Sequence, residues 1–215
     1  MGVDNIGIHG MHIGGFQPFS LSDFPGKAAA IVFTQGCNFS CPYCHNRSLW
    51  TSQPAGPFKM TAPEVLSFMK GRRGRLGGVV ITGGEPTLQG GLAAFLASVK
   101  GLGFAVKLDT NGSQPGVVAG LLAGDLIDYV AMDLKAPPEK YNRLCGCRVD
   151  MDAIRSTIDT IAASGVPHLF RTTFYQKLLS AGDIDALKTL LPAHSRFTLQ
   201  AYKAPLQLGS HADDL

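Results

Sequence analysis

Hydrophobic and polar positions along the 215-residue chain follow two alternating patterns. Short apolar and β-branched runs, typical of buried strands, are separated by segments in which apolar residues recur with helical spacing. The predicted strands are 28–36, 77–84, 104–112, 127–135, 166–174 and 196–202. The predicted helices between them are 62–73, 91–103, 114–124, 151–165 and 181–192. This strict alternation predicts a parallel sheet with right-handed crossover connections.

The number of strand–helix units limits the fold to an α/β architecture with an open sheet. No strand run follows residue 202, which excludes a closed barrel of eight units. An open partial (β/α)6 barrel or a doubly wound sheet remains. The length suits one core, so residues 11–215 are predicted to form a single domain. Residues 1–10 are glycine-rich and aperiodic, and we expect them to form a flexible N-terminus.

Composition narrows the possible partners. Charged residues make up 16% of the chain, below the roughly 25% of soluble proteins. The net charge of +3 is small and scattered, which argues against a nucleic-acid surface. The basic run at 71–78 is typical of a helix end and a solvated loop. No apolar run approaches the ~18 residues of a membrane span, and no secretory signal is evident, so we expect a cytoplasmic protein.

Unusual polar residues follow each of the first five predicted strands or lie within them. Because carboxyl ends of parallel strands share one edge of a sheet, these residues are predicted to converge on a single site. They are a cysteine cluster after 28–36, GGEP at 83–86, DTNG at 109–112, MDLK at 132–135, and Arg171 in the fifth strand.

The cysteine cluster, QGCNFSCPYCHN at 35–46, admits three interpretations. CPYC is a dithiol redox motif, but a thioredoxin-like fold is shorter than this chain and has no use for Cys37. A structural zinc ion could take Cys37, Cys41, Cys44 and His45, although adjacent Cys44 and His45 would then have to chelate one tetrahedral ion. Three thiolates in one loop also suit a [4Fe–4S] cluster that has one iron open to substrate.

The spacing C-x3-C-x2-C, with an aromatic residue before the last cysteine, resembles the cluster loop of radical S-adenosylmethionine (SAM) enzymes. The GGEP turn after the next strand strengthens the resemblance. In that superfamily the open iron binds the amino and carboxylate groups of SAM. An electron from the reduced cluster then cleaves SAM to give a 5′-deoxyadenosyl radical.

Longer stretches resemble glycyl-radical-enzyme activases, and among them the activating proteins of anaerobic ribonucleoside-triphosphate reductase. The matching text is GGFQPFSLSDFPGKAAAIVFTQGCNFSCPYCHN, GVVITGGEPTLQ, GFAVKLDTNG, DYVAMDLKAP and FRTTF. The resemblance implies an open (β/α)6 barrel. It also implies that Cys37, Cys41 and Cys44 hold the cluster and form the catalytic centre.

The same resemblance implies a SAM pocket. Tyr43 would lie against the adenine, Gly84 and Glu85 would contact the methionine amino group, and Asp133 and Lys135 would lie near the ribose and carboxylate. The other implied cofactor-binding residues are Cys44, His45, Gly83, Asn111 and Arg171.

A monovalent cation is implied by the similarity to pyruvate formate-lyase activating enzyme, where such an ion lies near the cofactor carboxylate. The matching positions are Asp109, Thr110, the carbonyl of Ala131, and Asp133. Hard oxygen ligands of this kind suit a cation of low charge. The last strand departs from that relative, since LQAYKAP at 199–205 lacks its histidine, which leaves Gln200 and Tyr202 without an implied role.

Three functions remain open at this point. The chain is expected to activate a glycyl radical enzyme, either anaerobic ribonucleotide reductase or another such as pyruvate formate-lyase, with flavodoxin or ferredoxin as electron donor. A radical SAM enzyme acting on a small molecule, such as a deazaguanine-forming enzyme, and a zinc-stabilised binding module are the alternatives. Cys145 and Cys147, outside the cluster loop, are interpreted as ordinary thiols.

Overall fold

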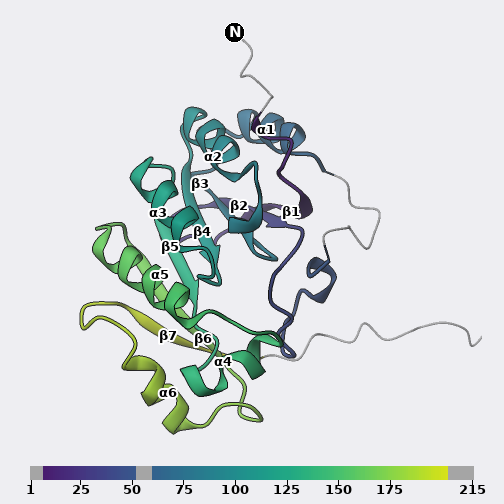
Figure 1. The fold of residues 1–215 in the computed structure, drawn as a ribbon. Helices are drawn as coiled ribbons and strands as arrows, with labels where there is room; N and C mark the ends of the chain where they lie inside the picture. Colours follow the sequence, from purple (N-terminus) through teal and green to yellow (C-terminus); the bar gives the residue numbers. More distant parts are fainter. Residues whose placement is uncertain (1–6, 52–59, 203–215) are drawn as a thin grey trace, which may run out of the picture.

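One sheet of seven strands organises the molecule (Figure 1). The computed structural model describes residues 7–51 and 60–202. The strands lie side by side in chain order. They are β1 (Ile13–Ser20), β2 (Ala29–Thr34), β3 (Gly78–Gly83), β4 (Ala105–Thr110), β5 (Tyr129–Asp133), β6 (His168–Phe174) and β7 (Phe197–Ala201). Strands β2 to β7 are parallel, and β1 pairs antiparallel with β2.

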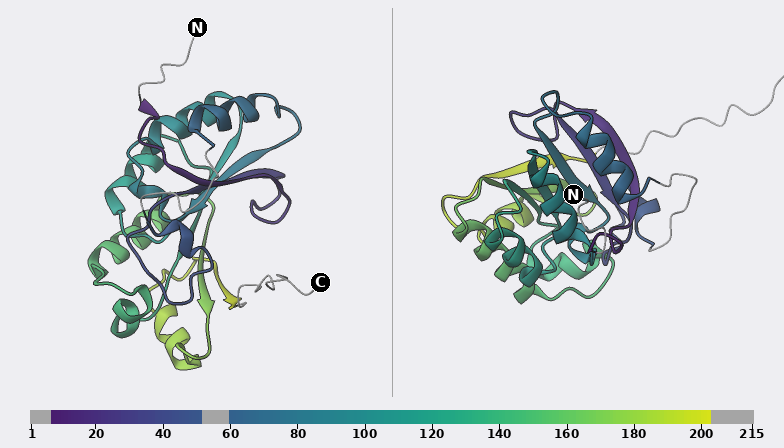
Figure 2. Two further views of the ribbon diagram at one scale, coloured as in Figure 1. Left: turned by 90° about the vertical axis from the view of Figure 1, so that its right-hand side faces the viewer. Right: turned by 90° about the horizontal axis from the view of Figure 1, so that it is seen from above.

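The helices that connect the parallel strands pack on the outer face of the curved sheet (Figure 2). They are α1 (Ala62–Lys70), α2 (Leu92–Gly101), α3 (Pro115–Ala123), α4 (Pro138–Cys145), α5 (Met151–Ala163) and α6 (Ala181–Lys188). The 3-10 helices η2 (Arg47–Leu49) and η3 (Pro86–Leu88) are short. Helix α1 begins with a capping box, in which Thr61 accepts a hydrogen bond from the amide of Glu64 and Glu64 accepts one from Thr61.

The structure confirms the predicted open α/β sheet, since the six parallel strands match the six sequence runs and β1 and β7 are not paired with each other. Besides the short 3-10 helices η2 and η3, strand β1 and helix α4 were not predicted. Strand β1 reads IGGFQPFS, without an apolar alternation, and its pairing depends on β2 as a template. Helix α4 begins at Pro138, directly after Pro137, and ends at Cys145, followed by Gly146, whose backbone is left-handed (φ 67°). Two consecutive prolines are more typical of a turn or loop than of a helix start, which hides this helix in the sequence.

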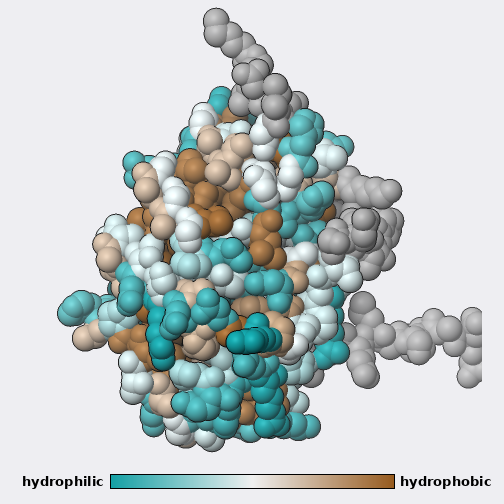
Figure 3. Space-filling model, viewed as in Figure 1, coloured by the Kyte–Doolittle hydropathy of each residue, from teal (hydrophilic) through white to brown (hydrophobic). Residues whose placement is uncertain are grey.

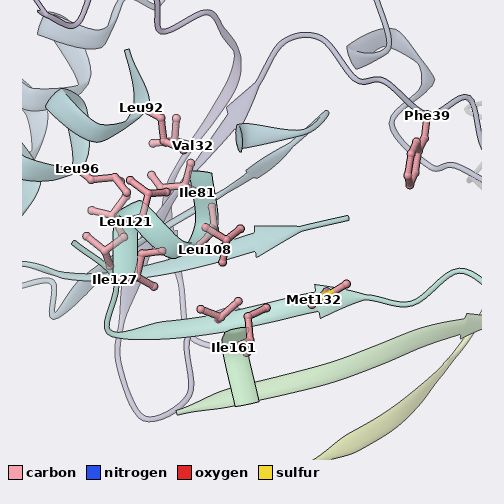
Figure 4. Close-up of a cluster of buried hydrophobic side chains, with 14 of the residues drawn as sticks. Val32, Phe39, Ile81, Leu92, Leu96, Leu108, Leu121, Ile127, Met132 and Ile161 are labelled. Atoms are coloured by element: carbon pink, nitrogen blue, oxygen red, sulfur yellow. The ribbon is translucent and has the colours of Figure 1, made fainter. Parts of the chain in front are cut away.

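The two faces of the sheet bury different sets of side chains, because successive residues of a strand point to opposite sides. On the outer face, Val32, Ile81 and Leu108 pack against Leu92 and Leu96 of α2 (Figure 4). On the inner face, a smaller apolar group is formed by Phe24, Ala29, Ile31 and Val80, with Phe33, Ala105 and Tyr129 beside it. This inner group fills the half barrel toward the amino ends of the strands and leaves its carboxyl end to polar residues.

The first described residues of the chain contribute to the larger core cluster, which includes Ile8. Ile8 is 5% exposed, so the expected flexibility of residues 1–10 does not extend to it, and residues 1–6 lie outside the described chain. Within the described residues, no helix has the length and apolar character needed to cross a membrane. The face in Figure 3 shows brown apolar areas interrupted by teal and white residues, as expected where helices turn their polar sides outward.

Candidate active site

A pocket of about 240 Å³ opens at the carboxyl edge of the sheet. Every site residue predicted from the sequence lines it, except Ala131. The predicted residues are Cys37, Cys41, Tyr43, Cys44, His45, Gly83, Gly84, Glu85, Asp109, Thr110, Asn111, Asp133, Lys135 and Arg171. The pocket is completed by residues that the sequence did not single out as a group, namely Phe39, Asn46, Trp50, Thr82, Thr173 and Gln200. Five separate sequence motifs therefore meet at one place.

Strand register explains the convergence. Asp109 lies opposite Ala131, and Asp133 lies opposite Arg171, so these residues share the inner face near the ends of β4, β5 and β6. On β7, Gln200 is paired with Thr173 and lies on the same face. A periodicity of two residues per repeat thus places polar residues from four strands around one cavity.

The cluster loop, residues 35–51, is closed at its base by main-chain hydrogen bonds. The amide of Gly36 donates to the carbonyl of Leu49 at 2.9 Å, and that of Cys37 donates to Trp50 at 3.2 Å. Within the loop, the amide of Cys44 donates to the carbonyl of Cys41 at 3.0 Å, which forms a turn between two of the cysteines. The loop is a defined structure built from its own backbone.

The three cysteines of this loop are free thiols in different surroundings. Cys41 is buried, whereas Cys37 and Cys44 are partly exposed. Burial raises the pKa of Cys37 from 9.0 to about 11. A hydrogen bond with Cys145 lowers the pKa of Cys41 below 9.0. A cysteine binds a metal as the thiolate. The surroundings of Cys41 favour this deprotonated form.

Cys145 and Cys147 lie against the cluster loop, although about 100 residues separate them from it in the chain. The carbonyl of Cys145 accepts a hydrogen bond from the amide of Ser40 at 2.8 Å, and the Cys147 thiol lies 3.4 Å from the carbonyl of Asn38. A Cβ atom on Gly146 would lie 2.5 Å from Ser40 Oγ, so only glycine fits between them. Nothing in the sequence predicts this contact, because no periodic pattern connects the turn to the loop.

Glu85, from the GGEP turn, connects the ends of β3 and β4. Its carboxylate is completely buried and accepts four hydrogen bonds. Thr87 donates from its amide at 3.1 Å and from its hydroxyl at 2.5 Å, Thr110 donates from its hydroxyl at 2.7 Å, and Asn111 donates from its amide at 2.7 Å. Burial raises the pKa of Glu85, and these four donors oppose that rise.

Next to Glu85, five charged side chains form a continuous chain across the inner face. Lys107 pairs with Asp109, Asp109 with Arg171 (3.0 Å), Arg171 with Asp133, and Asp133 with Lys135 (3.0 Å). Burial alone would raise the pKa of Asp133, but the charges of Arg171 and Lys135 hold it well below its ordinary value. The ionised form of Asp133 is therefore stable in this pocket.

Aromatic side chains form a further wall of the site. Tyr43 is 5% exposed. Among the buried side-chain oxygen and nitrogen atoms of the described residues, its hydroxyl is the one without a hydrogen-bond partner. The ring of His45 stacks on the ring of Tyr202, with centroids 5.3 Å apart. The ring centroids of Tyr202 and Tyr175 are 4.4 Å apart. Tyr202 thus reaches the site through His45, while Gln200 lines the pocket directly.

Comparison with known proteins assigns the family. The model of the Radical SAM superfamily matches residues 31–185. A proposed glycyl-radical enzyme activating enzyme of Methanocaldococcus jannaschii is 35% identical over 199 residues, which cover 89% of this chain and 80% of that protein. A 7-carboxy-7-deazaguanine synthase of Hyperthermus butylicus is 28% identical over 84% of this chain and 80% of its own length.

A similar fold occurs in the crystal structure of Streptococcus suis SuiB bound to its precursor peptide SuiA. The TM-score is 0.62 at 17% sequence identity, and the match covers 80% of this chain but 38% of the SuiB chain. The chain therefore spans about two fifths of that solved structure. An open α/β half barrel with three cysteines at its carboxyl edge defines a radical SAM domain. The chain belongs to the radical SAM superfamily.

Enzymes of this superfamily use a [4Fe–4S] cluster and SAM, and the pocket suits both. Three free thiols on one loop are a ligand set that suits such a cluster, and the unpartnered Tyr43 hydroxyl is a buried polar atom that a ligand can satisfy. Within the described residues, no three Cys, His, Asp or Glu side chains gather around a single point as one zinc ion requires. A four-iron cluster is a larger body and holds its cysteines further apart.

Proposed function

We propose that this protein is a radical SAM activase that generates a glycyl radical in an anaerobic ribonucleotide reductase. The proposal of an activase is supported by the 35% identity to a proposed glycyl-radical enzyme activating enzyme over most of both chains. The ribonucleotide reductase as substrate rests on the sequence stretches that resemble its activating proteins. The lower identity to a deazaguanine synthase makes a small-molecule substrate the second candidate.

The proposed reaction balances as a one-electron reduction followed by a hydrogen-atom transfer. When bound and reduced, the cluster supplies the electron that divides SAM into methionine and a 5′-deoxyadenosyl radical. That radical takes one hydrogen atom from a glycine Cα, which leaves 5′-deoxyadenosine and the glycyl radical. The flanking nitrogen and carbonyl stabilise the glycyl radical, so the protein's task is to hold the two carbons together in a site that excludes water.

Individual residues have distinct parts in this proposal. Cys37, Cys41 and Cys44 hold the cluster, and the lowered pKa of Cys41 supports its thiolate form. Glu85 Oε2 accepts a hydrogen bond from the Asn111 amide and retains a free lone pair for the SAM amino group.

The SAM carboxylate and adenine are assigned to other side chains of the pocket. Lys135 and Arg171 provide positive charge for the carboxylate. Tyr43 offers its ring to the adenine and its free hydroxyl to a polar atom of the ligand.

The partner must present its glycine on a loop that enters from outside. The sheet does not close between β1 and β7, which suits entry of a peptide segment at the side of the half barrel. Such a loop becomes ordered as it docks, which favours a transient complex. We expect a flavodoxin or a ferredoxin to supply the electron.

The experiment combines the reconstituted, reduced protein with SAM and either anaerobic ribonucleotide reductase or pyruvate formate-lyase. A glycyl doublet in the EPR spectrum of the reductase, with formation of 5′-deoxyadenosine, is the expected result. Cys41→Ala is the inactive variant, and Cys147→Ala is the matched control because it removes a thiol beside the same loop. A reductase whose glycine is deuterated at Cα should transfer deuterium to 5′-deoxyadenosine.

Other outcomes separate the alternatives. A doublet only on pyruvate formate-lyase would contradict the reductase and retain the activase class. Formation of 5′-deoxyadenosine without a doublet on either enzyme would favour a small-molecule substrate. In that case, the precursor of the deazaguanine ring would be the first compound to test, given the similarity to the Hyperthermus butylicus enzyme.

A further inference from the structure

Lys107 is a buried lysine on the inner face of the half barrel. It lies in the middle of β4, in register with Val80 on one side and Tyr129 on the other, and is 5% exposed. Its ammonium group pairs with Asp109 Oδ1, two residues further along the same strand and on the same face. A lysine is rarely buried in this way unless its charge has a defined partner.

With this ammonium group, every carboxylate oxygen of Asp109 and Asp133 is paired with a cationic side chain. Asp109 Oδ1 faces Lys107, and Asp109 Oδ2 faces Arg171 at 3.0 Å. Asp133 Oδ1 faces Arg171, and Asp133 Oδ2 faces Lys135 at 3.0 Å. All four carboxylate oxygens therefore have a protein cation, and three cations face two carboxylates.

The same residues were the expected ligands of a monovalent metal ion, and their arrangement does not suit one. The ion would have to displace an ammonium or guanidinium group, which would leave that group buried without a partner. The Thr110 hydroxyl is also engaged, since it donates to Glu85 at 2.7 Å and accepts from the Gly112 amide at 3.1 Å. An added cation would enter a cluster that already carries excess positive charge.

We propose that the Lys107 ammonium, paired with the pocket residue Asp109, is the fixed cation behind this pocket and that the chain binds SAM without a monovalent metal ion. Lys107 neutralises one side of Asp109, which leaves Arg171 held between two carboxylates. Lys135 and Arg171 then retain a net positive charge toward the ligand carboxylate. Lys107 is thus a positioning residue, and it acts through Asp109 and Arg171.

The first test needs no variant. The affinity of the reconstituted protein for SAM is measured by anaerobic calorimetry in potassium, sodium and choline chloride at equal ionic strength. Because the resident cation is covalently attached, the dissociation constant should agree within about twofold among the three salts. A weakening of tenfold or more in choline would show that a metal ion is required and would overturn the proposal.

The second test removes the Lys107 charge, so that SAM affinity should come to depend on an added metal cation. Lys107→Met removes the charge and keeps most of the side-chain volume, so SAM affinity in choline should fall about tenfold or more, and potassium or sodium should restore it. Lys107→Arg keeps the charge and should bind SAM equally well in all three salts. Lys100→Met is the matched control, because Lys100 also pairs with an aspartate, Asp128 at 2.7 Å, but Asp128 does not line the pocket, whereas Asp109 does.

Two results with Lys107→Met would contradict the proposal. Unchanged affinity in choline would show that the charge is not needed, and a loss that no cation restores would assign Lys107 to packing alone. If Lys107→Met does not fold, the salt series on the wild type and on Lys107→Arg still decides the question. The inference concerns SAM binding, so a negative glycyl-radical assay would leave it intact.

Discussion

Two hollows open at opposite edges of the sheet. The larger one lacks the cysteines and the paired acidic and basic residues that line the smaller one. The hollow at the amino ends of β5, β6 and β7 measures about 380 Å³, against about 240 Å³ at the carboxyl edge. The larger hollow contains two histidines, Arg196 and Tyr129, which are residue types often found in active sites. Their contacts, however, are ordinary. The ring nitrogens of His168 contact the carbonyl of Val166 at 3.0 Å and the Ser195 hydroxyl at 3.3 Å.

The difference follows from the direction of the strands. At the amino edge the chain enters β4 and β6 through turns at Gly103 and Gly165, where the backbone has positive φ. At the carboxyl edge the segments that follow β2, β3 and β4 carry the cysteines, Glu85 and Asn111. A site in this fold is therefore recognised by mutually constrained polar groups at the carboxyl edge, and the volume of a hollow is a poor guide.

The largest effect is expected from removing a cluster ligand at the carboxyl edge. Cys41→Ala should abolish the iron–sulfur cluster, seen as loss of the brown colour and of about four irons per chain after reconstitution. The fold should persist, because Cys41 is one small side chain at the margin of a core whose larger members are the side chains of the strands and helices. Circular dichroism of the variant should match that of the cluster-free wild type.

Cys145→Ala is the control for that experiment, since it removes a thiol that contacts Cys41 without being a ligand. It should retain the cluster. Loss of iron from this control together with retention in Cys41→Ala would reverse the assignment of the two cysteines.

The next largest effect is expected from the chain of charges. Asp133→Ala leaves Lys135 without its partner and Arg171 with one carboxylate, so SAM affinity should fall about tenfold or more while the cluster stays largely intact. The free energy of unfolding should fall by about 2 kcal/mol, less than for a fully buried pair, because 31% of the Asp133 side chain is exposed. Calorimetry and urea denaturation measure the two quantities.

Asp128→Ala, which breaks the Lys100 pair outside both hollows, is the comparison for Asp133→Ala. It should leave SAM affinity unchanged. Equal affinity in Asp133→Ala and the wild type would remove Asp133 from the binding site.

A smaller effect is expected at Glu85. Glu85→Gln replaces an acceptor by an amide that directs N–H groups toward the hydrogen-bond donors of Thr87, Thr110 or Asn111. We expect a loss of about 1 kcal/mol in the free energy of unfolding of the cluster-free protein, and weaker SAM binding in the reconstituted one. Glu139→Gln, at an exposed position of α4, should change neither.

The smallest effect is expected in the amino-edge hollow. Arg196→Ala removes an exposed side chain there and should change SAM affinity by less than about twofold and stability by about 0.5 kcal/mol or less. A large loss of SAM binding in this variant, measured by the same calorimetry, would mean that the two hollows are coupled.

The sequence was sufficient for those parts of the structure that depend on local pattern. Short apolar and β-branched runs predicted the six parallel strands, and strand direction then placed Glu85, Asp109 and Asp133 at one edge. Strand β1 escaped prediction, because its glycines and polar residues become a strand only by pairing with β2.

The remaining features of the site depend on tertiary contacts. Lys107 resembles any surface lysine in the sequence, and only the half barrel shows that it is buried beside Asp109. In the same way, nothing local connects Cys145 with Cys41 or predicts that Thr110 and Asn111 donate to Glu85. Side chains distant in the chain become partners only after the sheet has assembled.

The closed base of the cluster loop has a consequence for repair. Because Gly36 and Cys37 are bonded to Leu49 and Trp50 through the main chain, the fold itself provides the entropy loss of closing the loop. We therefore expect iron and sulfide to enter a loop whose two ends are already held together, and a protein that has lost its cluster to oxygen to accept a new one without refolding.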